Sequence, residues 1–228
     1  KINMVYVEGK SSSDQKNLFS FSKKIMEAQI KPKTKGTKQL SQNWFIEKLT
    51  RTHIAVPLTI FTIISTSLIY YGITEGLVSG INALILFLLG LLFFTLVEYV
   101  MHRFLFHLTP STKRAEKAAY VMHGVHHDFP KDKDRLAMPI PASLLLSYLF
   151  YLLYSFIMGD AVFGFLPGFL MGYAGYLWVH FMVHAFQPPK NFFKVLWIHH
   201  GIHHYKDDKN AFGVSSPLWD WVFGTMPK

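Results

Sequence analysis

Four long apolar runs dominate the pattern of hydrophobic and polar positions along this chain. They cover approximately residues 54–73, 81–100, 139–158 and 161–179. Each run is close to the roughly 20 residues that an α-helix needs to cross the hydrocarbon core of a bilayer. Short links over residues 74–80 and 159–160 join the first pair of runs and the second pair. A buried helix of a soluble domain can imitate one such run, but four in this arrangement predict four membrane-spanning helices.

The segment before the first run is polar and basic. Residues 1–39 are rich in Lys and Ser with little periodicity, which predicts a flexible basic N-terminal tail before a single domain over residues 40–228. Residues 40–52 place Trp44 and Phe45 beside Lys48. This pattern fits either an amphipathic helix at the membrane interface or an ordinary helix that faces solvent.

Composition supports the membrane interpretation and limits the chemistry. Half of the 228 residues are hydrophobic and 21 are Phe, and the mean hydropathy of +0.22 is high for a soluble domain. The sequence contains no cysteine, which excludes disulfides, iron–sulfur clusters and thiolate ligands. Its first residues are polar and show no cleavable signal peptide. We therefore expect an all-α, polytopic membrane protein in which nitrogen and oxygen atoms hold any metal.

The distribution of charge predicts the orientation in the membrane. Of the 23 Lys and Arg residues, 11 precede the first run, 7 lie between the second and third runs, and 5 follow the fourth. The two short links contain only Glu75 and Asp160 as charged residues. By the positive-inside rule, both termini and the central loop face the cytoplasm. Topology and anionic lipid headgroups thus account for the net charge of +9, and no nucleic-acid partner is expected.

Histidine clusters are the strongest functional signal in the sequence. Ten of the twelve histidines form four clusters: His102 and His107; His123, His126 and His127; His180 and His184; and His200, His203 and His204. Composition alone predicts roughly 0.03 copies of H-x-x-H-H in a chain with this histidine content. The chain has two copies. A zinc site uses three or four protein ligands, so ten histidines are too many for one metal. Shared between two octahedral metals, they give five ligands each and leave one open position apiece for O2.

The spacing within the clusters predicts which histidines share a helical face. Residues three and four apart lie together on an α-helix, as in His180 and His184 and in both H-x-x-H-H tripods. His102 and His107 would diverge by about 140° on an ideal helix. Either each of these two serves a different metal, or the helix is bulged at this point.

Several polar neighbours of the clusters have more than one interpretation. Glu98 precedes His102 by four residues and either orients it through a hydrogen bond or faces Arg or water as an interfacial acid. Asp128, directly after a tripod, has the same two interpretations. His199 is a substitute ligand, a hydrogen-bond partner of the site or a solvent-facing neighbour.

Other residues are expected at the membrane boundary. His53 stands alone beside the first run, and we interpret it as an interfacial residue. Trp219 and Trp221, with Leu218 and Phe223, are expected to anchor the C-terminal segment at the lipid boundary. The alternative for these aromatic residues is to line a substrate entry.

The motifs resemble those of fatty acid 2-hydroxylases in the membrane fatty acid hydroxylase superfamily. Residues 98–107 (E-Y-V-M-H-R-F-L-F-H) resemble the first histidine box, and residues 123–127, with Arg135 and the P-I-P run at 139–141, resemble the second. His180 to His184 matches the third box. The C-terminal signature is matched by residues 199–205, 212–215 and 218–220. The likeness extends from about Leu49 to the end of the chain.

This resemblance implies a fold, a reaction and a set of ligands. The fold is a four-span helical membrane protein with a cytoplasmic helical cap that holds a histidine-rich dimetal centre. The reaction is O2-dependent hydroxylation at C2 of a long acyl chain, in a fatty acid or in the N-acyl chain of a ceramide-like lipid. The implied metal ligands are His102, His107, His123, His126, His127, His180, His184, His200, His203 and His204.

The resemblance also implies cofactors and partners. Two iron ions are expected, with zinc as a replacement in purified protein, together with O2 and a lipid substrate from the bilayer. Many eukaryotic relatives carry a fused cytochrome b5 domain with an H-P-G-G haem motif, which this sequence lacks. Electrons are therefore expected from a separate protein, of the cytochrome b5 or ferredoxin type with its reductase. The expected location is a bacterial inner membrane or the endoplasmic reticulum.

Two alternatives remain at the level of sequence. Sterol desaturases, C4-methyl oxidases and carotenoid hydroxylases share this metal chemistry, although the five-residue spacing of the first box and the Trp219–Asp220 run favour an acyl hydroxylase. A membrane metal transporter is the second alternative. Transport paths place ionisable groups near the bilayer midplane, whereas these runs are almost free of them.

Overall fold

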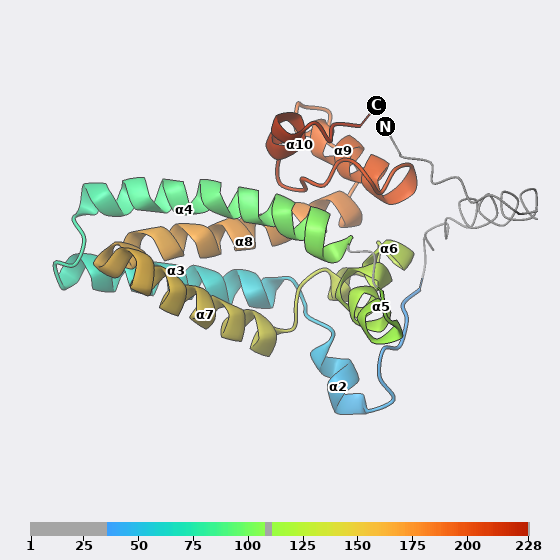
Figure 1. Cartoon of the computed structure of the whole chain (residues 1–228), viewed down its shortest axis with the longest axis horizontal. Coiled ribbons are helices and arrows are strands. Elements are labelled where there is room, and N and C mark those ends of the chain that lie inside the picture. Colours follow the sequence, from blue (N-terminus) through green and yellow to red (C-terminus); the bar gives the residue numbers. More distant parts are fainter. Residues whose placement is uncertain (1–35, 108–110, 228) are drawn as a thin grey trace, which may run out of the picture. The chain divides into compact units, whose positions relative to one another are not determined.

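Helices, turns and loops make up the described part of the chain, with no strand among the described residues (Figure 1). The computed structural model describes residues 36–107 and 111–227. The helices in chain order are α2 (Trp44–Leu49), α3 (Ala55–Thr74), α4 (Gly80–Val100), η1 (Met101–Phe106), α5 (Lys113–Ala119), η2 (Tyr120–Gly124), α6 (Val125–Asp128), η3 (Lys133–Arg135), α7 (Ile140–Met158), η4 (Gly159–Ala161), α8 (Val162–Ala185), α9 (Lys194–Tyr205) and α10 (Leu218–Phe223). The all-α fold class expected from the sequence is therefore confirmed for these residues.

The apolar runs form the long helices α3, α4, α7 and α8. The observed boundaries of α3, α4 and α7 lie within one residue of the predicted ones. By contrast, α8 continues to Ala185 rather than ending near residue 179, so His180 and His184 belong to this helix. The helix can continue because no Gly or Pro interrupts its last turns, which are apolar apart from the two histidines.

Three helical segments of the described chain are long and apolar enough to cross a membrane, judged by length and composition. They are Ala55–Thr74, Gly80–Phe106 and Lys133–Ala185. The third segment contains both α7 and α8, so this count is three rather than the four expected from the sequence. Gly159, between these helices, has a φ of 56°, a conformation that glycine adopts without strain. Figure 1 shows the chain reversing its direction there.

Glycines allow α4 and α8 to approach each other closely. A Cβ atom added at Gly90 would lie 2.0 Å from the carbonyl oxygen of Phe165. One added at Gly168 would lie 1.9 Å from the carbonyl oxygen of Phe87. Membrane helices commonly pack through such small residues, because lipid provides little hydrophobic force between them. These contacts set the spacing of the two helices whose ends carry histidines.

Aromatic side chains fill the rest of the core between the long helices. Phe61 of α3 is fully buried, and its ring centroid lies 5.2 Å from that of Tyr173 in an edge-to-face arrangement. Phe94 and Phe169 meet in the same way at 5.3 Å. Such geometry is favourable for aromatic pairs beyond the area that they bury. The pairs join α3 and α4 to α8, which is the central helix of the bundle.

The short helices gather at one end of the bundle, which we call the cap (Figure 1). The cap consists of η1, α5, η2, α6, η3, α9 and α10 with their loops, together with the last two turns of α8, and it lies where α4 ends. The histidine clusters that follow α4 and α8 in the sequence therefore meet there. The chain directions of α4 and α8 thus place the site at one end of the long helices.

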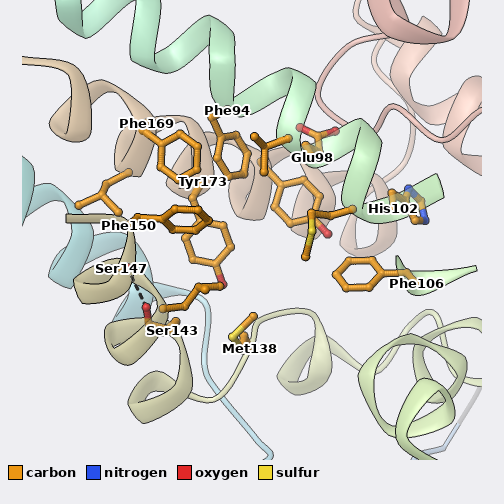
Figure 2. A pocket seen from close by; sticks show the side chains of 15 residues that line it. Phe94, Glu98, His102, Phe106, Met138, Ser143, Ser147, Phe150, Phe169 and Tyr173 are labelled. Carbon is orange, nitrogen blue, oxygen red and sulfur yellow. Dashed lines mark hydrogen bonds between the residues drawn. The ribbon is translucent and has the colours of Figure 1, made fainter. Parts of the chain in front are cut away.

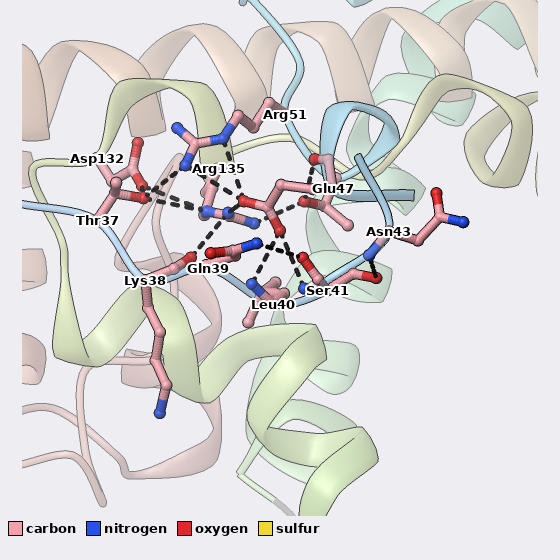
Figure 3. Close-up of polar contacts among 11 residues, drawn as sticks. Thr37, Lys38, Gln39, Leu40, Ser41, Asn43, Glu47, Arg51, Asp132 and Arg135 are labelled. Atoms are coloured by element: carbon pink, nitrogen blue, oxygen red, sulfur yellow. Dashed lines mark hydrogen bonds and ion pairs between the residues drawn. The ribbon is translucent and has the colours of Figure 1, made fainter. Parts of the chain in front are cut away.

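The N-terminal segment of the described chain is tied to the cap by a polar network around Arg135 (Figure 3). Arg135 donates to the Glu47 carboxylate, to the Thr50 hydroxyl at 2.7 Å and to the Lys38 carbonyl at 2.8 Å. The Thr37 hydroxyl donates to Asp132. Burial alone would raise the pKa of Glu47, but N–H groups of the backbone and Arg135 outweigh it and lower that pKa. Most of the predicted tail over residues 1–39 lies outside the described residues, and its end at Thr37 and Lys38 is fixed by these bonds.

The helix expected over residues 40–52 is shorter than predicted. It covers only Trp44–Leu49, and Asn43 caps it by accepting from the N–H groups of Phe45 and Ile46. The helix begins later than predicted because the N–H groups of Leu40 and Ser41 donate to the Glu47 carboxylate, which holds these two residues outside the helix. Trp44 is 72% exposed and none of the residues in this helix is buried. The interfacial role of this helix stays a prediction.

Candidate metal centre

All ten histidines of the four sequence clusters converge in the cap. They form two groups of five, and within each group one ring nitrogen from every histidine lies within 4.8 Å of the others. The first group consists of His102, His107, His123, His127 and His203. The second consists of His126, His180, His184, His200 and His204. Each group draws on several separate helices, so it is complete only when these segments lie together.

Both H-x-x-H-H tripods are divided between the groups. His123 and His127 belong to the first group, and His126 between them belongs to the second. In α9, His203 joins the first group while His200 and His204 join the second. The sequence spacing predicts that a tripod shares one helical face, but the two groups lie close enough that one face serves both. His200 and His203 have ring centroids 6.0 Å apart.

A π-helix brings His102 and His107 into the same group. The segment Met101–Phe106 is π-helical, and the N–H of His107 donates to the carbonyl of His102, five residues earlier, at 3.3 Å. This i→i+5 bond closes a wider turn than an α-helix has and places residues five apart on one side. The bulged helix is thus the correct alternative of the two that the sequence left open. A second π-helical turn, Tyr120–Gly124, carries His123.

The distances between imidazole nitrogens fit a metal polyhedron. In the first group the Nε2 atom of His123 lies 3.0 Å from that of His102 and 2.9 Å from that of His127. In the second group the Nε2 atom of His200 lies 2.9 Å from that of His184 and 3.0 Å from that of His204. With a metal–nitrogen bond of about 2.1 Å, two nitrogens at right angles around one ion lie about 3.0 Å apart.

No placement of protons turns all the nitrogen–nitrogen contacts of the first group into hydrogen bonds. His102 contacts the carbonyl oxygen of Phe212 through Nδ1, and a carbonyl only accepts, so Nδ1 carries the proton and Nε2 presents a lone pair. The His123 Nε2 faces both this lone pair and the His127 Nε2. If the His123 Nε2 is protonated, it can donate to only one of these two neighbours. If it is not protonated, its lone pair faces the lone pair of His102. In either case one of the two contacts is not a hydrogen bond. A cation bound by all the lone pairs removes this conflict, and the donor set fits a divalent metal.

Burial keeps the cap histidines neutral. Burial, reinforced by neighbouring imidazoles, lowers the pKa of His123, His126 and His127 well below the usual value. The same causes lower the pKa of His203 to about 3. Neutral imidazole is the form that binds metals. At physiological pH these histidines are therefore in the form that could hold a metal.

A loop between α9 and α10 holds two histidines of the first group through their Nδ1 atoms. The carbonyl of Phe212 accepts from His102 Nδ1, and the carbonyl of Asn210 accepts from His203 Nδ1 at 2.8 Å. Carboxylates hold this loop in turn. Glu98 accepts from the N–H of Val214 at 2.7 Å and from the N–H and hydroxyl of Ser215.

Asp220 holds the same loop from the other side. Its carboxylate accepts from the N–H groups of Phe212 and Gly213 at 2.9 and 2.7 Å and from the Thr225 hydroxyl at 2.7 Å. His199 is buried and its Nε2 lies 2.9 Å from Asp220. Burial alone would raise the pKa of Asp220, but the hydrogen bonds, led by that of His199, lower it below its usual value. Asp220 thus stays ionised and anchors four neighbours.

The structure decides between the alternatives that the sequence left open for several polar neighbours. Glu98 is buried and does not face Arg or water, and it supports His102 through the loop rather than by direct contact. Asp128 accepts from the Tyr120 hydroxyl at 2.7 Å, not from a histidine. His199 belongs to neither histidine group and is not solvent-facing, because it pairs with Asp220. His53 is exposed, and its Nδ1 accepts from the N–H of Ala55 at 3.3 Å.

The two tryptophans of α10 have different environments. The Nε1 of Trp219 donates to the Thr95 hydroxyl at 2.9 Å, which fixes α10 to α4. Trp221 is 74% exposed, and Leu218 and Phe223 are exposed beside it. Anchoring at the lipid boundary stays a prediction for the exposed residues, and Trp219 has in addition a structural contact that the sequence does not indicate.

An apolar cavity leads from the interior of the bundle to the first histidine group (Figure 2). Side chains of α4, α7 and α8 line it, and His102 is the histidine that reaches it. Figure 2 shows His102 and Phe106 at one end of the cavity and Phe150 and Phe169 toward the other. Met138 lies along one side. The lining of this cavity is mostly apolar, which suits a hydrocarbon chain.

Comparison with known families identifies the chain. The family model described as fatty acid hydroxylase matches residues 87–225, which is more than half of the sequence. The chain belongs to the fatty acid hydroxylase family. The matched region begins within α4 and ends after α10, so it contains all ten histidines of the two groups.

Named relatives of this fatty acid hydroxylase family member act on lipids. The chain is 41% identical to the fatty acid 2-hydroxylase of Mus musculus over 62% of its own length and 39% of that protein. It is 38% identical to a dihydroceramide fatty acyl 2-hydroxylase of Arabidopsis thaliana over 60% of its length and 59% of that protein. The ceramide very long chain fatty acid hydroxylase of Saccharomyces cerevisiae is 35% identical, over 84% of this chain and 50% of the yeast protein. The chain thus spans about half the length of these curated relatives.

A solved structure shares the fold of this family member. It is described as full-length Scs7p with only the hydroxylase domain visible, and it superimposes with a TM-score of 0.79 at 33% identity. The match covers 85% of this chain and 74% of that chain. The similarity therefore extends beyond the histidine boxes to most of the helical bundle.

Sequence reasoning did not identify the loop carbonyls or the cavity. The carbonyls of Asn210 and Phe212 are backbone atoms and leave no side-chain signal, although Gly213 next to them marks a place without room for a side chain. Phe94 and Phe150 line the cavity, but in the sequence they look like lipid-facing residues of two apolar runs. Only packing distinguishes the two kinds of position.

Proposed function

We propose that this protein hydroxylates a long acyl chain at C2, using O2 and a pair of iron ions bound by the ten histidines. The substrate is a fatty acid or the N-acyl chain of a ceramide-like lipid. The observation that carries the proposal is the apolar cavity that ends at His102, a member of the first histidine group. An acyl chain whose tail lies in this cavity would have its C2 end near the first histidine group. The lipid hydroxylase activities named for the relatives support the same reaction.

The histidine groups suit iron, and the proposed reaction needs a redox-active ion. Five neutral imidazoles per ion leave a coordination position for O2 when the ion prefers six ligands. Bound iron would supply the electron transfer to O2 that oxygen insertion into a C–H bond requires. Zinc has no redox chemistry, so a zinc-loaded preparation should be inactive.

The residues around the cavity hold the substrate and exclude water. Phe150 and Phe169 form an apolar wall for the distant part of the chain, and Phe106 covers the end near His102. Removal of water favours the apolar substrate and protects reactive species from side reactions. The ring of Phe106 stacks on that of His123 with centroids 4.9 Å apart, so it also covers the first group on this side.

The proposal includes a membrane arrangement and an electron source. We propose four spans, formed by α3, α4, α7 and α8, with both termini and the cap on the cytoplasmic side. The turn at Gly159 supports two spans in the segment Lys133–Ala185, and the charge distribution supports the orientation. Electrons would come from a separate cytochrome b5 or ferredoxin type protein, and the lipid substrate would enter from the bilayer.

Incorporation of isotopically labelled O2 tests the function. Lipids from cells with and without the protein are compared by mass spectrometry after growth under heavy-isotope O2. We expect one acyl class to gain one heavy oxygen atom at C2 in the presence of the protein. A product that loses two hydrogens and gains no oxygen would instead indicate a desaturase.

A pair of histidine variants provides the matched control. His126→Ala is expected to abolish the product and to lower the metal content of the purified protein, because His126 belongs to the second group. His53→Ala should change neither, since His53 is exposed and lies outside both groups. Full activity and unchanged metal content in His126→Ala would contradict the proposal.

A further inference from the structure

The two histidine groups differ in the contacts of their second ring nitrogen. In the first group, His102 and His203 donate from Nδ1 to the carbonyls of Phe212 and Asn210. In the second group, the buried Nδ1 atoms without a hydrogen-bond partner among the described residues are those of His126, His180, His200 and His204. The groups have the same number of histidines, but in the described part of the chain only the first has backbone carbonyls that accept hydrogen bonds from Nδ1.

This difference affects how readily each group binds a metal. An imidazole coordinates through Nε2 only when the proton sits on Nδ1, and the partner of Nδ1 decides which tautomer is present. The loop carbonyls fix this tautomer for His102 and His203 before any metal arrives. In the second group, a buried Nδ1–H without an acceptor is unfavourable by about 1–3 kcal/mol, so the protein does not favour the binding tautomer.

The carbonyls of the first group are held in place by a rigid loop. Residues 210–215 are fixed by Asp220, through the N–H groups of Phe212 and Gly213, and by Glu98, through Val214 and Ser215. The loop is also tightly packed. A Cβ atom at Gly213 would lie 2.1 Å from the carbonyl oxygen of Ser216 and 2.9 Å from the Asp220 carboxylate. The loop therefore has no room to shift without losing these bonds.

We propose that the 210–215 loop presets the first histidine group, so that a divalent metal ion enters this group first and leaves it last. Glu98 and Asp220 are then positioning residues, which act on His102 and His203 through the loop. The inference rests on the proposed function only in requiring that both groups bind metal. It adds that the two positions are unequal and names the part of the fold that makes them so.

Metal titration tests the order of loading. Full-length protein in detergent is stripped of metal and titrated with Co²⁺ in competition with a chromophoric chelator. We expect two separate binding steps. His107→Ala should weaken the tighter step, because His107 belongs to the first group, and His184→Ala should weaken only the weaker step.

Substitutions in the loop test its role directly. Gly213→Ala should lower the affinity of the tighter step by about 10- to 100-fold, the usual effect of losing an outer hydrogen-bond partner, and leave the weaker step unchanged. Gly201→Ala is the matched control, since Gly201 lies in α9 among the ligands but an added Cβ would meet nothing within 4 Å. Ser215→Ala removes only a hydroxyl from Glu98 and should cause a smaller loss in the same step.

The outcomes separate this inference from the proposed function. Equal Co²⁺ affinities of the two steps in the unmodified protein would overturn the order of loading. So would an equal loss of affinity in both steps of Gly213→Ala. Neither result would contradict a two-metal enzyme. If one or both groups bind no Co²⁺, the proposed function itself is overturned. Helical circular dichroism checks that each variant is folded, and if Gly213→Ala is not, Ser215→Ala decides the question.

Discussion

Replacing Gly168 with alanine should separate α4 from α8 at the point where their backbones touch. In the structure, the added Cβ atom would lie 1.9 Å from the carbonyl oxygen of Phe87. Real Cβ atoms essentially never approach closer than 3.0 Å, so the helices must move apart by at least the difference, 3.0 − 1.9 = 1.1 Å. The contact is with backbone, which cannot rotate away as a side chain would.

The expected loss follows from the cost of overpacking. Forcing extra atoms into a close-packed interior typically costs about 1–3 kcal/mol. Gly175→Ala is the matched control, because Gly175 lies in the same helix and an added Cβ would meet nothing within 4 Å. Both variants gain about 1 kcal/mol of intrinsic helix propensity, so the difference between them isolates the helix contact.

Thermal unfolding in detergent and metal content per chain are the measurements. Gly168→Ala should melt at a lower temperature than Gly175→Ala and should retain less metal. The second effect is expected because α4 leads into His102 while α8 carries His180 and His184. Gly168→Ala that is as stable as Gly175→Ala would refute the close helix contact as the origin of the bundle spacing.

Three further predictions concern pH, the N-terminal segment and the cavity. Lowering the pH from about 7.5 to about 5.5 should destabilise the metal-free protein, because unfolded histidines with a pKa near 6.5 take up protons while folded His123, His126 and His127, whose pKa values are lowered, do not. Stability is thus full above the unfolded pKa and lost as the pH falls below it, and chemical unfolding at several pH values checks the sign. Arg135→Met should release residues 36–51 to proteolysis, since its side chain is 3% exposed and breaking a buried ion pair costs about 3–5 kcal/mol. Arg51→Met, at a side chain that is 34% exposed, should have little effect in the same assay. Ser147→Trp should fill the cavity and reduce product from long acyl chains more than from short ones, and an equal reduction at all lengths would argue against binding of the chain there.

Glu98 and the first histidine pair illustrate the limits of local reasoning. Sequence spacing places Glu98 one helical turn before His102, which suggests a direct contact, yet its carboxylate binds backbone N–H groups more than a hundred residues away. His102 and His107 were ambiguous because α-helical geometry separates them, and the π-helix that unites them depends on contacts with α9 and η2. Neither outcome is encoded within one turn of helix.

The sequence by itself determined the helical class, the boundaries of α3, α4 and α7 and the ten histidines that meet in the cap. These follow from hydropathy and from residue spacing, which act over a few neighbouring positions and need no tertiary contact. Only the tertiary structure decided how the histidines divide into two groups of five, which cavity reaches them and which loop supports the first group. Those features depend on the approach of segments far apart in the chain, and that approach is set by the glycine contacts between α4 and α8 and by the buried carboxylates of Glu98 and Asp220.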